Sequence, residues 1–427
     1  MVAKPIEKGY NTPNDDPFGG AKMKRNLWVL YLLLVVLLTA CGGEKVPETT
    51  PPPVEVEIPY IEETAPRLPY EGTQLTFRSI WWEEEAQAQV LKQAADFFEK
   101  KTGADIDFLW LEEEGDADLF QIAASDFADV DAATLLDLTE MAEESGYAEK
   151  SHEVLRSQIT DQCGFLGAVA QVPYLGGVYY NADVFTNCDI TEIPRSWEEF
   201  EETAATLKTA GWEPLTLDKE DAVAAMELHL RRTIGNEEMR KYMGKNDHWH
   251  FDQTVIAAME QVMLFVQAGY MTYGTPAEYP EGQNKMGISN SAMMVGTNGD
   301  CRAIEEETLT DLRWGMFPFP GEKESGTWME ADMIAIRPDC ENPQAAFDFM
   351  MLLVTGEFDQ LRADVSDGIP ADPSNTSPVA GAMEALQEAQ PYPLGVFGKK
   401  QTDTAVKLWS GWYTAANRYA IALERSK

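Results

Sequence analysis

The histidines, the side chains that serve most often as catalytic bases and metal ligands, form no recognisable site in this sequence. There are four of them: His152, His229, His248 and His250. The last two lie in Asp247-His248-Trp249-His250-Phe251-Asp252, which has the residue types of a metal site. Two histidines that are two residues apart would share a face in a strand but not in a helix. We favour a solvated loop for this segment over a metal site. The sequence contains no His-Glu-x-x-His, Gly-x-Ser-x-Gly or Walker motif, and it therefore predicts no catalytic residue, metal or cofactor.

Acidic side chains are abundant but form no recognisable catalytic pair. The run Glu112-Glu113-Glu114 has the carboxylates of a glycosidase pair or a calcium site, although a solvated charged turn is the more frequent origin of such a run. Among the 427 residues, 72 Asp and Glu against 33 Lys and Arg give a net charge of −39. This balance argues against nucleic acid as a partner, because binding of phosphates depends on basic side chains.

Aromatic residues are the informative excess, with eleven tryptophans in the chain. An aromatic face suits the C–H-rich face of a sugar ring, and polar neighbours then bind the hydroxyls. Trp81 and Trp82 follow the first expected strand, and Ser125 and Asp126 follow another in the same way. Since ligands of open α/β sheets bind outside the carboxyl ends of the strands, these positions are candidates for a ligand site.

Alternating strands and helices are expected to position these residues. Residues 75–80 alternate apolar and polar as a strand does, and a helix with apolar residues at helical spacing follows and ends at Gly103. Residues 105–111 predict a second strand, and 119–122 begin a further strand–helix unit. This order indicates a mostly parallel sheet with helices on both faces.

Later helices have clear start signals. Ser196 and Glu199 form the pattern of a capping box ahead of a helix over 197–210. Asn342 and Pro343 predict the start of a helix that continues to Thr355, and residues 253–267 are apolar at helical spacing.

The amino end has the layout of a secretory signal. Lys24 and Arg25 precede an apolar run over 27–38, which is shorter than the roughly 20 residues of a membrane-spanning helix. The sequence Leu38-Thr39-Ala40-Cys41 then resembles a bacterial lipobox, in which the cysteine is lipidated and becomes the first mature residue. We therefore expect residues 1–40 to be a signal region with translation starting at Met23, and the mature protein to be extracytoplasmic and anchored to the cell membrane by a lipid on Cys41.

The residues after the lipobox are expected to form a disordered spacer over 41–71. Residues 42–71 contain seven Pro and seven Glu. The segment has too few large apolar side chains to bury and become ordered. Four cysteines remain in the body: Cys163, Cys188, Cys301 and Cys340. In an exported protein this even number favours two disulfides of undetermined pairing, with metal ligation as the second choice.

Several short segments, taken in order, carry a family resemblance. They are Asp116-Ala117-Asp118-Leu119-Phe120, Val172-Pro173-Tyr174, Tyr179-Tyr180-Asn181-Ala182-Asp183-Val184-Phe185, Pro194-Arg195-Ser196-Trp197-Glu198-Glu199-Phe200 and Gly368-Ile369-Pro370. Together with residues 286–300 and 329–353, they resemble family 1 extracellular solute-binding proteins, the maltose-binding-protein-like receptors of ABC importers. The resemblance runs from Thr73 to the carboxyl end.

The resemblance implies an α/β, two-lobed fold of the periplasmic-binding-protein type II kind, with a ligand cleft between the lobes. It implies an N-terminal lobe of 72–172 plus 329–367 and a C-terminal lobe of 173–328 plus 368–427. The chain is expected to cross between the lobes near 172–178, 328–332 and 367–372.

The resemblance also selects residues for the cleft. The candidates for ligand binding are Trp82, Glu83, Ser125, Asp126, Tyr174, Asp300, Trp328, Glu330 and Trp412. Where members often end the segment 286–300 in Gly-x-Trp, this chain has Asn298-Gly299-Asp300, so a carboxylate replaces an aromatic platform.

The function implied is that of a monomeric, lipid-anchored carrier that delivers a small solute to the permease of an ABC importer, with a sugar or oligosaccharide as the first choice. A polyamine or other cationic solute is an alternative within this class, given the many carboxylates. An anchored extracellular glycosidase or other hydrolase is the alternative from another class, and a surface adhesion or sensor protein without a small ligand is a third.

Overall fold

The computed structural model describes residues 67–217, 221–235, 252–273, 291–308, 312–321, 323, 326–388 and 411. All of them belong to one compact unit, Ala65–Lys427. The predictions for Cys41, for the histidine pair at 248 and 250, and for Trp412 lie outside the described residues.

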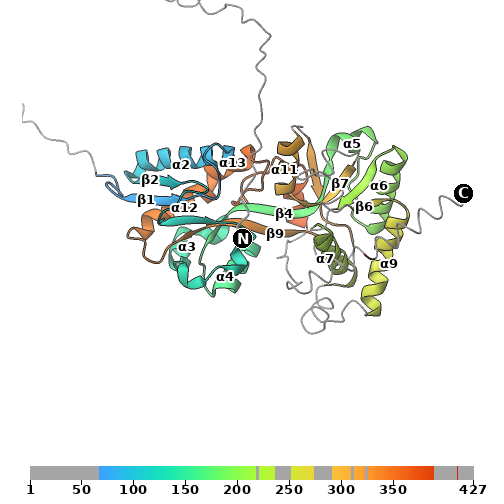
Figure 1. Ribbon diagram of the computed structural model, residues 1–427, viewed down its shortest axis with the longest axis horizontal. Coiled ribbons are helices and arrows are strands. Elements are labelled where there is room, and N and C mark those ends of the chain that lie inside the picture. The colour runs from blue at the N-terminus through green and yellow to red at the C-terminus, as the bar shows by residue number, and fades with distance from the viewer. Residues whose placement is uncertain are drawn as a thin grey trace, which may run out of the picture. The chain divides into compact units, whose positions relative to one another are not determined.

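One mixed sheet carries the architecture, with strand order β2-β1-β3-β9-β4-β7-β5-β6 and β8 paired to β4 (Figure 1). Its strands are β1 Gln74–Arg78, β2 Asp105–Leu109, β3 Leu119–Ile122, β4 Val169–Asn181, β5 Glu213–Leu217, β6 Met271–Tyr273, β7 Ser291–Thr297, β8 Trp314–Phe317 and β9 Trp328–Ile336. The ladders β1–β2, β1–β3, β5–β6 and β5–β7 are parallel, whereas every ladder made by β4 or β9 is antiparallel. The α/β fold is confirmed, and the antiparallel central strands are an addition to the expected parallel sheet.

Three helices begin at the residues that the sequence predicted, Trp197, Gln253 and Pro343, although the predicted cap Asn342 makes no side-chain capping bond. The helices of the described residues are α2 Ala86–Thr102, α3 Thr139–Ser145, α4 Glu153–Cys163, α5 Ala182–Asn187, α6 Trp197–Thr209, α7 Asp221–Ile234, α9 Gln253–Gln267, α11 Asn298–Thr308, α12 Pro343–Val354, α13 Gly356–Val365 and α14 Ala382–Glu388. The capping box of α6 is present, with Glu199 N donating to Ser196 Oγ at 3.2 Å. Helix α2 ends as predicted at Gly103, whose φ of 79° is left-handed and favours glycine.

The predicted second strand is two residues too long, because β2 ends at Leu109. Trp110 and Leu111 leave the strand for a turn in which Glu113 N donates to the Trp110 carbonyl at 2.9 Å. The Trp110 ring still packs in the core, with its centroid 4.8 Å from that of the Phe108 ring. The apolar pattern of the sequence therefore extends beyond the end of the strand, which is why the prediction was too long.

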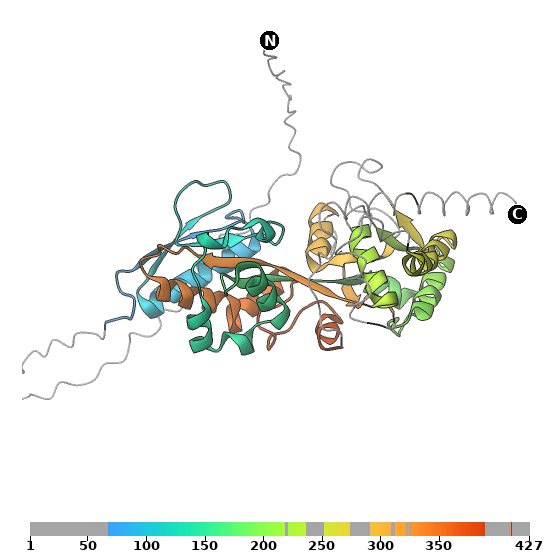
Figure 2. The same cartoon turned by 90° about the horizontal axis from the view of Figure 1, so that it is seen from below.

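Three apolar cores surround the sheet. The first joins residues of 75–172 to residues of 333–371, including Phe77 and Phe349. The second uses residues between 178 and 328, such as the stacked pair Phe200 and Phe265 with ring centroids 5.1 Å apart. The third covers one face of β4 and β9. Strands β4 and β9 run from one half of the ribbon to the other in both views (Figures 1 and 2), and they carry residues of the first two cores. These two strands therefore connect the two halves of the body.

The prediction of two disulfides is wrong, because all four cysteines of the body are free. Cys163 and Cys340 pack against the first core, Cys188 against the second, and Cys301 is buried in the third. In these surroundings the four cysteines pack as small apolar side chains. Within the described ranges, no group of three His, Cys, Asp or Glu side chains could hold a metal ion, and no helix is both long and apolar enough to cross a bilayer.

Candidate ligand-binding site

The β4–β9 ladder presents a row of polar side chains on one of its faces. Tyr174 lies opposite Glu330, Val172 opposite Asp332, and Gly176 opposite Trp328. Because alternate residues of a strand project to the same side, Tyr174, Glu330 and Asp332 share one face of the sheet. We call these three residues, together with Ser125, Asp126 and Asp300, the crossing-strand cluster.

Hydrogen bonds attach the end of β3 to this face. The Tyr174 hydroxyl donates to Asp332 Oδ2 at 2.7 Å, and Ala124 N donates to Asp332 Oδ1 at 2.9 Å. Ser125 and Asp126 come next in the chain, with Ser125 Oγ donating to Asp126 Oδ1 at 3.1 Å at the surface. The carboxyl end of β3 thus delivers two polar side chains beside Asp332, as the sequence predicted for a strand end.

The start of α11 delivers Asp300 to the same region. Its Oδ2 accepts hydrogen bonds from Thr297 N at 2.6 Å and from Thr297 Oγ1 at 3.0 Å. The neighbouring Asn298 Oδ1 accepts from Leu175 N at 2.9 Å, which holds α11 against β4. A Cβ atom at Gly299 would lie only 3.0 Å from the Tyr174 ring, so this glycine permits the close approach.

The carboxyl groups of the cluster interact through their charges. Burial raises the pKa of Glu330, and the charges of Asp300 and Asp332 raise it further. Burial also raises the pKa of Asp332, against the hydrogen bonds from Tyr174 and Ala124. The site therefore concentrates negative charge in a partly buried position, where Asp300 and Asp332 oppose ionisation of Glu330.

A buried ion pair lies behind the cluster. Arg362 is 2% exposed and donates to Asp359 Oδ1 at 2.9 Å and to the Ile369 carbonyl at 2.6 Å. Its charge lowers the pKa of Asp332, which opposes the effect of burial. The pair joins α13 to the segment around Ile369, where the sequence predicted the third crossing.

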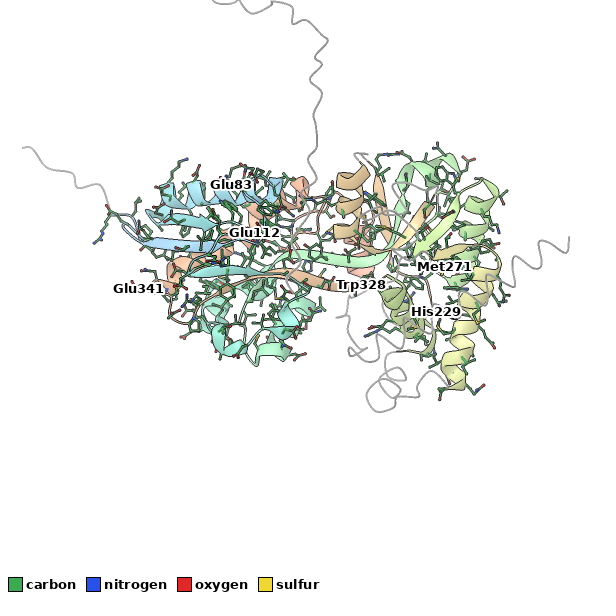
Figure 3. The ribbon with its side chains drawn as sticks, viewed as in Figure 1. Glu83, Glu112, His229, Met271, Trp328 and Glu341 are labelled. Carbon is green, nitrogen blue, oxygen red and sulfur yellow. The ribbon has the colours of Figure 1, made fainter. Side chains whose placement is uncertain are left out.

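Two of the predicted cleft residues, Trp82 and Glu83, lie at the start of α2. Trp82 is 45% exposed, and its backbone N donates to Glu85 Oε1 at 2.8 Å. The Glu83 carboxylate pairs with Lys92 at 2.7 Å, and Figure 3 shows Glu83 beside α2, well away from Trp328. The hydrogen bonds of these two residues connect them to α2 and not to the crossing-strand cluster.

Trp328 is part of the core, at 3% exposure. Its indole covers Gly176, where a Cβ atom would lie 1.9 Å from the ring, and it packs with the second core. A ring enclosed in this way presents no open face for stacking on a ligand. Its Nε1 has no hydrogen-bond partner among the described residues.

Sequence reasoning missed Asp332, Asn298 and Arg362 as parts of the site. The signal for Asp332 was present, because Glu330 and Asp332 alternate with Met329, Ala331 and Met333 in an otherwise apolar strand. Charged side chains that recur every second residue of a buried strand predict a polar face. Arg362 is far from the other site residues in the sequence and offers no comparable signal.

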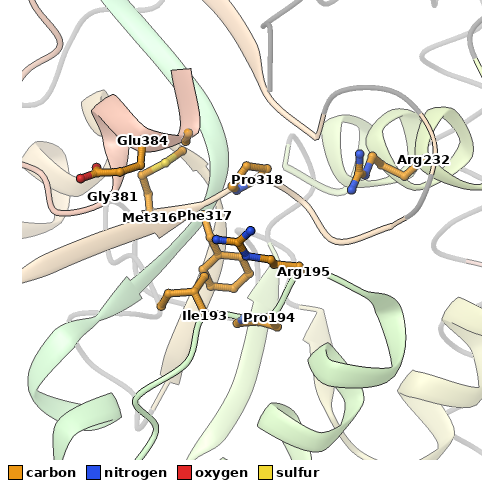
Figure 4. Close-up of a pocket in the computed structure, with 10 residues that line it drawn as sticks. Ile193, Pro194, Arg195, Arg232, Met316, Phe317, Pro318, Gly381 and Glu384 are labelled. Atoms are coloured by element: carbon orange, nitrogen blue, oxygen red, sulfur yellow. The ribbon is translucent and has the colours of Figure 1, made fainter. Parts of the chain in front are cut away.

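A hollow of 340 Å³ lies beside β8 and α14 (Figure 4). It is lined by Ile193, Pro194, Arg195, Arg232, Met316, Phe317, Pro318, Gly381, Glu384 and Ala385. The Arg232 guanidinium donates to the Lys323 carbonyl at 2.8 Å, which fixes the loop after β8. No residue of the hollow belongs to the crossing-strand cluster, so the two features are separate.

Comparison with known proteins identifies the class. The family model of bacterial extracellular solute-binding proteins matches residues 81–356. The chain belongs to this family, whose members bind solutes and are not enzymes. A search of curated proteins returned no match.

Solved structures share the fold at low sequence identity. Ligand-free RafE from Streptococcus pneumoniae has a TM-score of 0.62 and 16% identity, over 82% of this chain and 97% of that one. The bacterial solute receptor AcbH has a TM-score of 0.59 and 16% identity, over 83% and 99%. A chitin oligosaccharide binding protein has a TM-score of 0.54 and 18% identity, over 82% and 99%. These structures confirm the periplasmic-binding-protein fold expected from the resemblance.

Proposed function

We propose that the protein is the substrate-binding component of an ABC importer and binds a sugar or oligosaccharide at the crossing-strand cluster. The observation that carries the proposal is the family match over 81–356 together with a polar face on the two strands that connect the halves of the body. Sugar binding is supported by the names of the similar structures, which include RafE with raffinose and a chitin oligosaccharide binding protein. Tyr174 and the carboxylates supply hydrogen-bonding groups for hydroxyls.

Binding is coupled to closure of two lobes in this proposal. The lobes are 72–172 plus 329–367 and 173–328 plus 368–427, and β4 and β9 link them. Ser125 and Asp126 come from the first lobe and Asp300 from the second. A ligand that contacts both sides only in the closed state stabilises that state.

The test measures ligand binding and product formation together. Neutral oligosaccharides of several linkages are titrated into the protein while tryptophan emission and calorimetric heat are recorded, and the mixture is analysed for hydrolysis. We expect binding without product. Release of shorter sugars would overturn the proposal in favour of the anchored hydrolase.

Two phenylalanine variants locate the site. Tyr174→Phe removes the hydroxyl bonded to Asp332 and should weaken binding about tenfold. Tyr180→Phe makes the same change where the ring stacks on Phe185 at 4.1 Å, outside the cluster, and should leave the affinity unchanged. Equal effects of the two variants would contradict the assignment of the site.

We also propose that a lipid on Cys41 anchors the mature monomer outside the cell membrane, with residues 42–71 as a spacer that keeps it near its permease. Cells expressing the wild type should incorporate labelled palmitate into the protein and retain it in the membrane fraction. Cys41→Ala should abolish both signals. Labelling that persists in Cys41→Ala would exclude this anchor.

A further inference from the structure

Residues 366–381 form a third link between the lobes, besides β4 and β9, and we call them the third connection. They begin after α13, which packs against α2 and α12 of the first lobe (Figure 1). They end at α14, which packs against β8 of the second lobe. The family resemblance implied a crossing between the lobes at 367–372. The hydrogen bonds of the third connection indicate a different division.

The five residues after Asp367 are all hydrogen-bonded to the first lobe. Their partners lie in α13 and at the N-cap of α4. The bonds run from Gly368 N to the Ala363 carbonyl at 2.8 Å, from Arg362 Nη2 to the Ile369 carbonyl at 2.6 Å, from His152 Nε2 to the Pro370 carbonyl at 2.9 Å, and from Ala371 N and Asp372 N to the Asp359 carboxylate at 2.9 and 3.0 Å. Because Asp359 and Arg362 are at most 2% exposed, water does not replace their bonds. A bend at 367–372 would break several of these bonds at once.

The attachment to the first lobe continues as far as Ser377. Thr376 N donates to Gln360 Oε1 of α13, and Gln360 Nε2 donates back to the Thr376 carbonyl, both at 2.9 Å. Ser377 Oγ then donates to the Gly368 carbonyl at 2.9 Å. Residues 368–377 are therefore folded onto the first lobe as one piece.

The attachment to the second lobe begins at Ala380. Its carbonyl accepts a hydrogen bond from Met316 N at 2.9 Å, and Ala380 forms a bridge with Gly315 of β8. The next residue, Gly381, approaches β8 so closely that a Cβ atom there would collide with the Met316 carbonyl. Strand β8 in turn pairs with residues 178–181 of β4, in the second lobe. From Ala380 the chain is thus fixed to the second lobe.

Pro378 and Val379 separate these two attachments. Pro378 is exposed, has no N–H group and makes no hydrogen bond with the described residues. Val379 N donates to the nearby Ser377 Oγ at 3.2 Å, and the Val379 side chain packs in the third core. Apolar contacts have no fixed direction, so this side chain can slide while the backbone turns. Rotation at Pro378 therefore breaks none of the bonds to either lobe.

We propose that the third connection bends at Pro378 and Val379, so that residues 366–377 move with the first lobe and residues 380–388 with the second. The proposal rests on the lobe closure of the proposed function, and it moves the lobe boundary from residue 367 to residue 377. A few loop residues that absorb the backbone rotation are typical of hinge closure. Because proline fixes its own φ and restricts the residue before it, few torsions are free to turn, and the range of the pivot is narrow.

The experiment measures distances between spin labels by pulsed electron paramagnetic resonance in the full chain. Labels are attached through a ketone-bearing amino acid, which leaves the native cysteines unlabelled. The three labelled positions are all exposed: Asp96 on α2, Glu202 on α6 and Pro373 in the third connection. The 96–373 pair should give a narrow distribution, because both labels belong to the first lobe. The 202–373 pair should be as broad as the 96–202 pair, which reports the lobes themselves.

Two glycine variants test the pivot. Pro378→Gly opens regions of φ that proline closes, and it should widen the 202–373 distribution at least about 1.5-fold while the 96–373 distribution stays unchanged. Pro338→Gly makes the same change at an exposed position of the first lobe and should leave both distributions as in the wild type. Both variants gain freedom in the unfolded state, so their stabilities should fall alike and the distances should distinguish them.

The outcomes separate the pivot from the proposed function. A 96–373 distribution as broad as that of 96–202 would overturn the proposal. Widening of neither pair in Pro378→Gly, or equal widening of the 202–373 pair in Pro338→Gly, would overturn it as well. Calorimetry with oligosaccharides tests the proposed function independently. Absence of binding together with the expected distances would overturn the sugar carrier and leave the pivot standing.

Discussion

The two faces of β4 and β9 are made by alternate residues of the same strands, yet they differ sharply in burial and charge. One face carries Leu175, Met329 and Ala331, each at most 1% exposed in the third core. The other carries the polar side chains of Tyr174, Glu330 and Asp332, of which Asp332 accepts hydrogen bonds from Tyr174 and Ala124. A single strand pair can therefore hold the two halves together with one face and present polar groups on the other.

Removal of apolar contacts from the enclosed face should have the largest effect on stability. Leu175 is fully buried, so Leu175→Ala should lower the free energy of unfolding by about 2–5 kcal/mol. Urea denaturation measures the change, with Leu264→Ala as the control because Leu264 is 60% exposed. The control should cost less than about 0.5 kcal/mol. Similar losses in both variants would show that burial of Leu175 does not set the cost.

Crowding of the polar face beneath Trp328 should have the next largest effect. Gly176→Ala places a methyl group within the indole ring, and the displaced ring should cost about 1–3 kcal/mol of stability. A double-mutant cycle with Trp328→Ala checks the cause, because the alanine at 176 should cost much less once the ring is absent. Additive effects would exclude the clash as the cause.

Replacement of the Glu330 carboxylate should have a smaller effect on stability, and this effect should depend on pH. The pKa of Glu330 is raised above its ordinary value of 4.5, so the folded state holds this proton more tightly than the unfolded state does. Its contribution to stability is therefore present below about pH 4.5 and is lost as the pH rises through the folded-state pKa. Thermal melts across this range should fall less steeply for Glu330→Gln than for the wild type or for Glu341→Gln, which makes the same change at an exposed position. An unchanged pH profile in Glu330→Gln would contradict the raised pKa.

The smallest effect is expected at Trp82, a predicted site residue whose backbone N donates to Glu85 and not to the cluster. Trp82→Ala should change stability by about 0.5 kcal/mol or less, since 45% of the side chain is exposed. It should also leave the affinity for an oligosaccharide ligand within about twofold, in contrast to Tyr174→Phe. A loss as large as that of Tyr174→Phe would add the start of α2 to the site.

Local signals in the sequence predicted local structure well. The capping box at Ser196 and the glycine stop at Gly103 each depend on residues close in the chain, and both are confirmed. The family and the α/β fold were likewise recognisable, because the motifs that carry them occur in order along the chain.

The composition of the site was harder to predict, because it depends on distant contacts. The role of Trp328 is set by the absence of a side chain at Gly176, which lies on another strand and far earlier in the chain. Trp81 and Trp82 are adjacent in the sequence, but the first is 7% exposed and the second 45%. No pattern of residue types distinguishes such pairs before the backbone positions are known.

The carboxylate of Asp359 has a further consequence, for the order in which the chain assembles. It accepts hydrogen bonds from Arg362 Nη2, Ala371 N, Asp372 N and Asn375 Nδ2, all within 16 residues. The β3–β9 ladder instead joins segments from opposite ends of the body, such as Leu119 and Ile336. Short loops close at lower entropic cost than long ones. We therefore expect the hydrogen bonds of Asp359 to form early during refolding, before the long-range strand pairs are complete.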